Sequence, residues 1–149
     1  MPTHYSGKSD AQRALNAYIA LMRASDSVSA RVHRHLGTSG LSISQFGVLE
    51  ILHHLGPLSP RDLCAKLLRS SGNVTLILDN LEKRDLIRRE RDQRDRRMVT
   101  IHLTEAGEAL ISEVFPAQVA AIQADFAVLT PAEQDELRRL CRKLGLQQG

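Results

Sequence analysis

Apolar residues recur at helical spacing in the middle of the chain. Four of them fall at positions i, i+3, i+4 and i+7: Val74, Ile77, Leu78 and Leu81. This spacing places all four on one side of a helix, and the other side is polar, so the pattern predicts a short amphipathic helix. Ser70 or Ser71 is expected to cap it, because a serine hydroxyl accepts a hydrogen bond from a free backbone N–H in the first turn.

Two short strands are predicted after this helix. Leu86 and Ile87 begin the first strand. The second strand has apolar residues in strict alternation, at Val99, Ile101 and Leu103. Side chains alternate along a strand, so these three should share one buried face. The segment therefore predicts a helix backed by a β-hairpin.

A charged run, residues 91–97, joins the two strands. Such a run is usually a solvated turn, and its interleaved aspartates would weaken a purely electrostatic phosphate clamp. They fit better as local partners, because Asp95 can accept a hydrogen bond from the backbone or from Arg97 and so fix the turn. Arg94 or Arg96 is then expected at the tip, where an arginine suits the narrow minor groove of DNA.

Three more helices are predicted before the central helix, and the third of them is its partner. The first spans residues 10–36, and the second starts at Ser42 or Ser44 and stops before Gly56. The third is opened by Ser59, which is followed by a proline and an acidic residue in the first turn. The third helix and the central helix, joined by a tight polar link, make a helix-turn-helix.

Amphipathic helices are predicted at both ends of the chain. After the hairpin a fifth helix begins near Thr104, and a sixth is capped by Thr130 and ends at Gly145. No predicted strand covers the apolar stripes of the two terminal helices. These stripes indicate a partner, most simply a second copy of the chain.

Composition limits the class of protein. The chain has 149 residues, 42% of them hydrophobic, which suits a single domain over residues 1–149. It contains no run of 18 apolar residues and no hydrophobic signal sequence at its start, so we expect a cytoplasmic protein without a membrane span. Cys64 and Cys141 lie on separate predicted helices, and we expect buried, reduced thiols there rather than a disulfide or a metal site.

The net charge of +3 is unevenly distributed along the chain. Residues 59–97 hold eleven Lys or Arg and seven Asp or Glu, a net of +4, and the other 110 residues sum to −1. Positive charge is therefore concentrated on the helix-turn-helix and the hairpin. Phosphate contacts supply the sequence-independent part of DNA affinity, so this location favours DNA binding.

Four segments resemble the MarR-type (multiple antibiotic resistance regulator) winged helix-turn-helix repressors: LSISQFGVLEIL (41–52), GPLSPRDLCAKLL (56–68), SGNVTLILDNLEKRDLIRR (71–89) and RDQRDRRMVTIHLTEAG (91–107). With the terminal helices, the resemblance covers nearly the whole chain. It implies a mainly α (α+β) fold with six helices and a β-hairpin wing. It also implies a homodimer that binds a near-palindromic site in double-stranded DNA.

The resemblance also implies roles for segments of the chain. Residues 41–103 would form the DNA-binding lobe, and residues 10–36 and 104–146 would form the dimerisation helices. Ser71–Lys83 would be the recognition helix, placed in a major groove, with the wing in the flanking minor groove. Asp85 stands where many members have glycine, and aspartate tolerates the left-handed backbone expected there.

The candidate DNA contacts follow from the residue patterns and from the family resemblance together. Asn73 and Thr75 are the best candidates for base edges, and the family's Asp-x-Arg wing signature matches the stretch from Asp95 to Arg97. Phosphate contacts from basic residues would set the register without reading sequence. The full set is Arg61, Arg69, Ser70, Ser71, Asn73, Thr75, Asn80, Lys83, Arg84, Arg94, Asp95, Arg96 and Arg97.

Members of this family are often switched by small phenolic or aromatic acids bound between the dimerisation helices and the DNA-binding lobe. His33 and His54, near the ends of the first and second helices, could contact such an effector, and the other interpretation is ordinary surface or cap histidines. No metal site is predicted, because the histidines lack ligand spacing. No cofactor is expected beyond the unidentified effector.

An enzyme and a protein-interaction module are the two rival classes of function. An enzyme is not indicated, because the sequence has no glycine-rich phosphate loop, no paired-carboxylate site and no Ser/Cys–His constellation. A winged helix can also serve as a protein-interaction module without direct DNA readout, and such a module would bind with a flat response to salt. We therefore expect a sequence-specific transcriptional regulator, acting as a ligand-responsive repressor.

Overall fold

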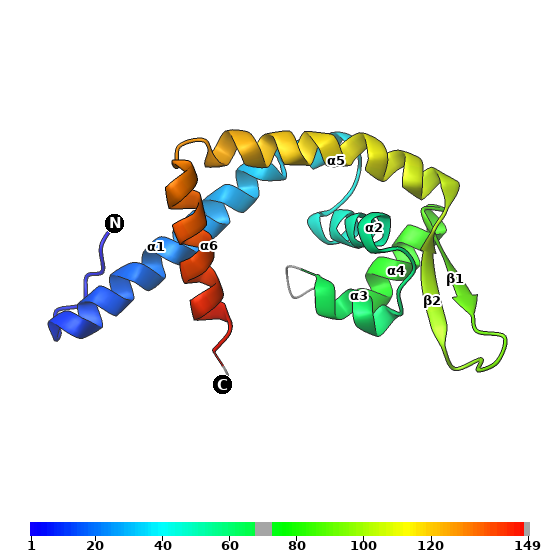
Figure 1. The fold of residues 1–149 in the computed structure, drawn as a ribbon, viewed down its shortest axis with the longest axis horizontal. Helices are drawn as coiled ribbons and strands as arrows, with labels where there is room; N and C mark the ends of the chain where they lie inside the picture. The colour runs from blue at the N-terminus through cyan, green and yellow to red at the C-terminus, as the bar shows by residue number, and fades with distance from the viewer. Residues whose placement is uncertain (68–72, 148–149) are drawn as a thin grey trace. The chain divides into compact units, whose positions relative to one another are not determined.

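The described part of the chain, residues 1–67 and 73–147, forms six α-helices and a two-stranded sheet in a computed structural model (Figure 1). The elements in chain order are α1 Ser9–Val32, the 3₁₀ helix η1 Arg34–Thr38, α2 Ile43–Leu55, α3 Pro60–Lys66, α4 Val74–Lys83, β1 Ile87–Arg91, β2 Val99–Leu103, α5 Glu105–Phe126 and α6 Pro131–Gly145. The predicted mainly α fold with a β-hairpin is confirmed.

Capping residues set most helix starts where the sequence predicts them. Ser42, Ser59 and Thr130 accept hydrogen bonds from backbone N–H groups in the first turns of α2, α3 and α6. The prediction for α4 is wrong by a few residues: its N-cap is Asn73, not Ser70 or Ser71, which lie outside the described residues. Asparagine caps as well as serine does, and here its side chain reaches the free N–H.

The first helix is shorter than predicted. It ends at Val32, and the chain continues as the tighter η1 rather than as an α-helix to Leu36. Leu36 still reaches the hydrophobic core from η1, where it is 3% exposed. Apolar spacing alone could not separate the two kinds of helix, because both bring residues three or four apart to one side.

Two compact units make up the chain. The core unit is His33–Gln118, which contains α2, α3, α4, the hairpin and the first part of α5. The terminal unit contains Met1–Val32 and the described residues from Val119 onward. These bounds follow packing and so divide α5, whereas the predicted segments, 10–36, 41–103 and 104–146, followed whole elements.

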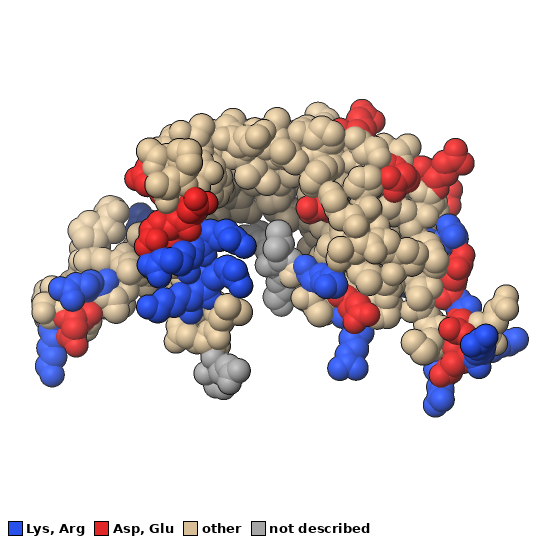
Figure 2. Space-filling model, viewed as in Figure 1, with Lys and Arg blue, Asp and Glu red and all other residues tan. Residues whose placement is uncertain are grey.

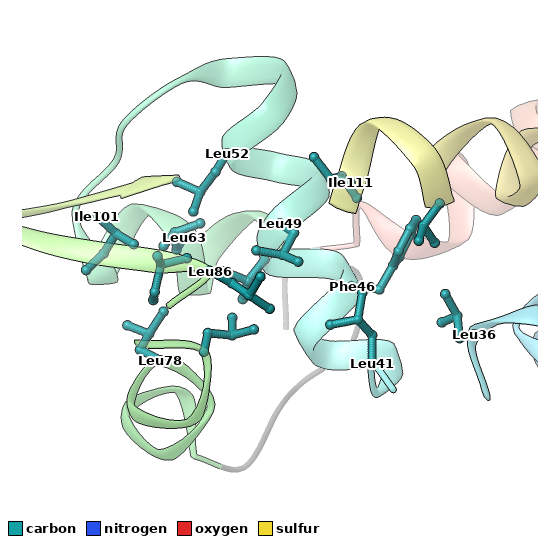
Figure 3. Packing of buried hydrophobic residues seen from close by; sticks show 14 residues of the cluster. Leu36, Leu41, Phe46, Leu49, Leu52, Leu63, Leu78, Leu86, Ile101 and Ile111 are labelled. Carbon is teal, nitrogen blue, oxygen red and sulfur yellow. The ribbon is translucent and has the colours of Figure 1, made fainter. Parts of the chain in front are cut away.

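The hydrophobic core lies in the core unit, where α2 is surrounded by α3, α4, β2 and the start of α5. Leu49 from α2, Leu63 from α3 and Leu86 at the start of the hairpin meet in its centre (Figure 3). Ile101 is completely buried, and Val99 and Leu103 are half-buried against the same cluster, so the predicted inner face of β2 is confirmed. This packing fixes the hairpin relative to α4.

The chain enters the hairpin through a strained turn. Asp85 has a φ of 59°, the left-handed conformation expected at this position, and its carbonyl accepts a hydrogen bond from the Thr104 hydroxyl at 2.6 Å. Where the hairpin leads into α5, Gly107 lies so close to the carbonyl oxygen of Leu86 that a Cβ would be 2.0 Å from it. Glycine is required there, because no side chain fits.

The predicted burial of the two cysteines is wrong, since Cys64 and Cys141 are both exposed. On α3 the buried residue is Leu63, and the next residue along a helix points about 100° away. On α6 no described residue is buried, so Cys141 shares the exposure of the whole helix. Neither thiol is paired in a disulfide.

Candidate nucleic-acid interface

α4 holds the core with one side and leaves the other open. Leu78 and Leu81 are 2% and 0% exposed, whereas Thr75, Asn80 and Lys83 are exposed. The helix packs on α2 and on α3, as a helix-turn-helix requires. Its polar side therefore has no role in the core, and it is the side that a groove of DNA could receive.

The N-cap of α4 changes what Asn73 can offer a ligand. Its Oδ1 accepts a hydrogen bond from the backbone N–H of Leu76 at 3.0 Å. A base contact from Asn73 would therefore use the amide N–H groups of its side chain, which are donors. Arg69 and the serines at 70 and 71, also predicted to touch DNA, lie outside the described residues.

Arg84 stands at the other end of α4 and binds the chain before α2. Its guanidinium donates to the carbonyl of Gly40 at 3.0 Å and to that of Ser39 at 3.4 Å. These bonds attach the end of α4 to the loop before α2. The predicted phosphate contact from Arg84 would have to use its remaining N–H groups. Arg61 and Lys83 are exposed, and within residues 1–67 and 73–147 their side chains make no hydrogen bond or ion pair that would compete.

Two aspartates shape the turn of the hairpin. Asp92 accepts hydrogen bonds from the backbone N–H groups of Arg94 and Asp95, at 2.7 and 3.3 Å. Asp95 accepts from the backbone N–H of Arg97 at 3.0 Å and from its Nε at 3.3 Å. The predicted role of Asp95 is confirmed. Asp92 makes the same Asx-type contact three residues earlier, and its role was not predicted.

Arginine side chains project from this turn without partners. Arg94 and Arg96 are exposed, and their side chains make no hydrogen bond or ion pair within the described residues. Arg91 donates to the carbonyl of Arg96 at 3.0 Å and so braces the same turn. Figure 2 shows Lys and Arg side chains projecting at the hairpin end of the molecule, with acidic side chains among them.

Arg89 joins the hairpin to α4, a contact that sequence reasoning missed. It extends from β1 and donates to Asp79 at 2.8 Å and to Glu82 at 2.9 Å, both on α4. The hydrogen bond to Asp79 raises the pKa of Arg89, and burial opposes that shift. The two acids stand three residues apart, which was a signal that they share a helix side, but nothing local identified their partner.

Comparison with known proteins identifies the family. The family model described as "MarR family" matches residues 41–99. The HTH-type transcriptional regulator YkoM of Bacillus subtilis is 36% identical over 137 residues, which are 92% of this chain and 89% of the relative. The chain belongs to the MarR family. The HTH-type transcriptional regulator MhqR of the same organism is 31% identical over 91% of this chain and 93% of its own length.

Solved structures agree with this assignment. BpsR of Bordetella bronchiseptica, whose DNA binding is regulated by 6-hydroxynicotinic acid, superposes with a TM-score of 0.80 at 28% identity, covering 99% of this chain and all of that one. AbsC, a MarR-family regulator of Streptomyces coelicolor, has the same fold with a TM-score of 0.81 at 22% identity. This MarR-family protein is accordingly a DNA-binding transcriptional regulator, and its relatives are regulators rather than enzymes.

The histidines predicted to meet an effector lie in different surroundings. His33 is half-buried just before η1. His54 is exposed at the end of α2, where its ring meets that of Phe115 edge-on at 4.6 Å and its Nδ1 lies 2.9 Å from the carbonyl of Glu50. Nearby, His53 Nδ1 lies 2.7 Å from Glu108 Oε1, close enough for an ion pair but without hydrogen-bond geometry.

Within residues 1–67 and 73–147, no group of three or more His, Cys, Asp or Glu side chains is placed to hold a metal ion. Over the same residues, no helix is both long enough and apolar enough to cross a membrane.

Proposed function

We propose that this regulator is a homodimeric, ligand-responsive repressor that binds a near-palindromic DNA site. Each protomer would place α4 in a major groove and the hairpin, as a wing, in the flanking minor groove. The observation that carries the proposal is the turn of residues 92–98, where aspartates hold the backbone and Arg94 and Arg96 have no partner among the residues that the structure describes. An arginine held out on a stiff ribbon suits the negative potential of a narrow minor groove.

The homodimer is supported by the terminal unit, which leaves large apolar side chains in solvent. Exposed members are Tyr18, Met22, Val119, Ile122, Leu137, Leu140 and Leu144. Scattered apolar residues are ordinary on a protein surface, but several on one amphipathic helix indicate an interface. A second copy would bury them and would present two recognition helices to two half-sites about one helical turn apart.

The effector is proposed to be a small aromatic acid. BpsR, a relative of similar fold, responds to 6-hydroxynicotinic acid. In this chain His54 and Phe115 form an aromatic contact at the surface of the core unit, and a flat ring could pack against it. His33 remains the second candidate contact. The effector would act by favouring a dimer whose recognition helices no longer fit the half-site spacing.

The test of DNA binding uses fragments selected from the source genome at a stated salt concentration. Fluorescence anisotropy then compares the wild type with Arg94→Ala and Arg96→Ala. At least one variant should bind the selected duplex more weakly, and its affinity should fall less steeply with salt, because each lost phosphate contact lowers the slope by about one. The dimer should be unaffected in both variants.

Arg13→Ala is the matched control, because it removes the same charge from α1 and leaves the wing unchanged. Equal affinity of the control and both wing variants would contradict the proposed role of the wing. Binding that does not depend on salt would favour a protein-interaction module instead.

A further inference from the structure

An apolar residue interrupts the polar side of α4. Leu76 is 54% exposed, and it is absent from both the buried core and the half-buried residues packed on it. Helical spacing places it in one stripe with Asn73, Asn80 and Lys83. This side is predicted to be polar because four other apolar residues fit the helical pattern without Leu76: Leu78 and Leu81, which are buried, and Val74 and Ile77, which are half-buried.

The neighbouring stripe of α4 is already occupied. Asp79 and Glu82 face the hairpin, where both bind Arg89. The stripe that contains Leu76 is therefore the side of α4 that neither the core nor the hairpin covers. A single exposed leucine is ordinary. Its place among polar and basic side chains, on the helix proposed to enter the major groove, makes it informative.

We propose that Leu76 is a specificity-determining residue that contacts the C5-methyl group of a thymine in the major groove. This inference rests on the proposed DNA binding by α4. In that groove thymine presents a methyl group beside its O4 acceptor, and no other base of unmodified DNA presents a methyl there, so an apolar side chain favours thymine. Asn80 and the amide of Asn73, one turn to either side of Leu76, can hydrogen-bond the edges of flanking bases.

The chemistry of the surroundings selects DNA over an apolar protein partner. Lys83 lies on the same stripe, and the exposed Arg94 and Arg96 lie on the hairpin that Arg89 joins to α4. One apolar side chain within such a basic and polar surface fits a single methyl group on an anionic duplex better than a hydrophobic interface, which needs a contiguous patch.

The experiment removes the methyl group and the leucine separately. In a duplex selected by the wild type, each thymine is replaced in turn by deoxyuridine, which differs only in lacking the methyl. One thymine per half-site should be sensitive, and its replacement should weaken wild-type binding by about fourfold, the value of one buried methyl-sized group. Leu76→Ala should bind the original duplex more weakly by a similar factor. Its affinity should not change further when deoxyuridine replaces that thymine, because in a double-mutant cycle two groups that contact each other have non-additive effects.

Leu55→Ala is the matched control, because Leu55 is 56% exposed at the end of α2 and is not part of the proposed DNA-binding side. It should keep the wild-type response to deoxyuridine. Leu76→Gln, which replaces the apolar end of the side chain by a polar amide, should behave like Leu76→Ala.

Two results would overturn the inference while DNA binding stands. In the first, no thymine replacement changes wild-type affinity. In the second, Leu76→Ala responds to deoxyuridine as the wild type does. The failure of the proposed function is distinguishable, because the wild type would then select no duplex with salt-dependent affinity. If Leu76 instead packs on a protein partner, Leu76→Ala should bind the original duplex as tightly as the wild type, and deoxyuridine should not change the affinity of either protein.

Discussion

Two amphipathic helices of this chain, α4 and α6, differ in where their apolar sides lie. In α4, Leu78 and Leu81 are 2% and 0% exposed, because α2 and the hairpin pack over them. In α6, Leu140 and Leu144 are 48% and 53% exposed, and no described residue of the helix is buried. Periodicity identifies an apolar side, but it does not say whether the same chain or another copy covers it.

The charges on the two helices differ in the same way. Asp79 and Glu82 of α4 bind Arg89 from another element. On α6 one ion pair lies within the helix: Arg139 donates to both carboxylate oxygens of Glu136, at 2.7 and 2.8 Å, and this bond lowers the pKa of Glu136. The acids of α4 thus bind another element of the core unit, whereas Glu136 of α6 binds a residue of its own helix.

The largest expected effect comes from truncating a buried leucine of α4, in contrast to an exposed leucine of α6. Leu81→Ala should lower the free energy of unfolding by about 2–5 kcal/mol, because it leaves a cavity in a packed core. Leu140→Ala is the matched truncation on α6 and should change that free energy by only about 0.5 kcal/mol or less at concentrations where the proposed dimer has dissociated. Urea denaturation measures both. Equal losses would mean that the apolar side of α6 is already covered within one chain.

A charge placed on the apolar side of α6 should act on assembly instead. Leu140→Glu would bury an unpaired carboxylate in the proposed dimer, so we expect dissociation to be favoured by about 100-fold. Analytical ultracentrifugation over a concentration series measures this shift. Ala132→Glu, which adds the same charge at the start of α6, is the control. A variant that sediments as the wild type does would place the dimer interface elsewhere.

Loss of the link between α4 and the hairpin should change DNA affinity more than it changes the free energy of unfolding. Arg89→Met removes both ion pairs but keeps an apolar stem, so DNA affinity should fall by about 0.5–2 kcal/mol as the wing loses its fixed position relative to α4. The free energy of unfolding should change by about 1 kcal/mol or less, as for other partly exposed pairs.

Arg88→Met is the control for this prediction, because Arg88 precedes Arg89 on β1 and pairs with Glu90 of the same strand at 2.9 Å. Anisotropy titrations and urea denaturation of both variants give the two quantities. Equal weakening of DNA binding by both would show that charge, and not the link to α4, is responsible.

The smallest effect concerns acid stability of the terminal unit. Arg31 of α1 donates to Asp125 of α5, and this hydrogen bond lowers the pKa of Asp125. A carboxylate with a lowered pKa in the folded state stabilises it above the pKa of the unfolded chain, near 3.9, and that contribution is lost as the pH falls through the folded value.

Asp125→Asn should therefore lose less thermal stability than the wild type between about pH 5 and about pH 2. Asp26→Asn, which removes the same charge from α1, should follow the wild type. Melting temperatures measured across this range test the prediction. Parallel curves for all three proteins would mean that the pair does not contribute.

Local chemistry determined most of the site in advance. The buried residues of α4 follow from their spacing, and the contact between Asp95 and Arg97 follows from their positions two residues apart in a turn. The start of α4 was misplaced, because serines and an asparagine compete for the cap over a few neighbouring positions and only the folded backbone selects one. The family resemblance, carried by these local motifs, also anticipated the fold.

The tertiary structure alone decided the contacts between distant elements and the exposure of single side chains. Arg84 binds a carbonyl 44 residues away, and Arg89 reaches α4 across a turn, and neither contact follows any local rule. Cys64 and Leu76 are exposed because their neighbours fill the core first. The apolar sides of α4 and α6 are equally legible in the sequence, but burial depends on what packs against a helix, and only the folded chain contains that information.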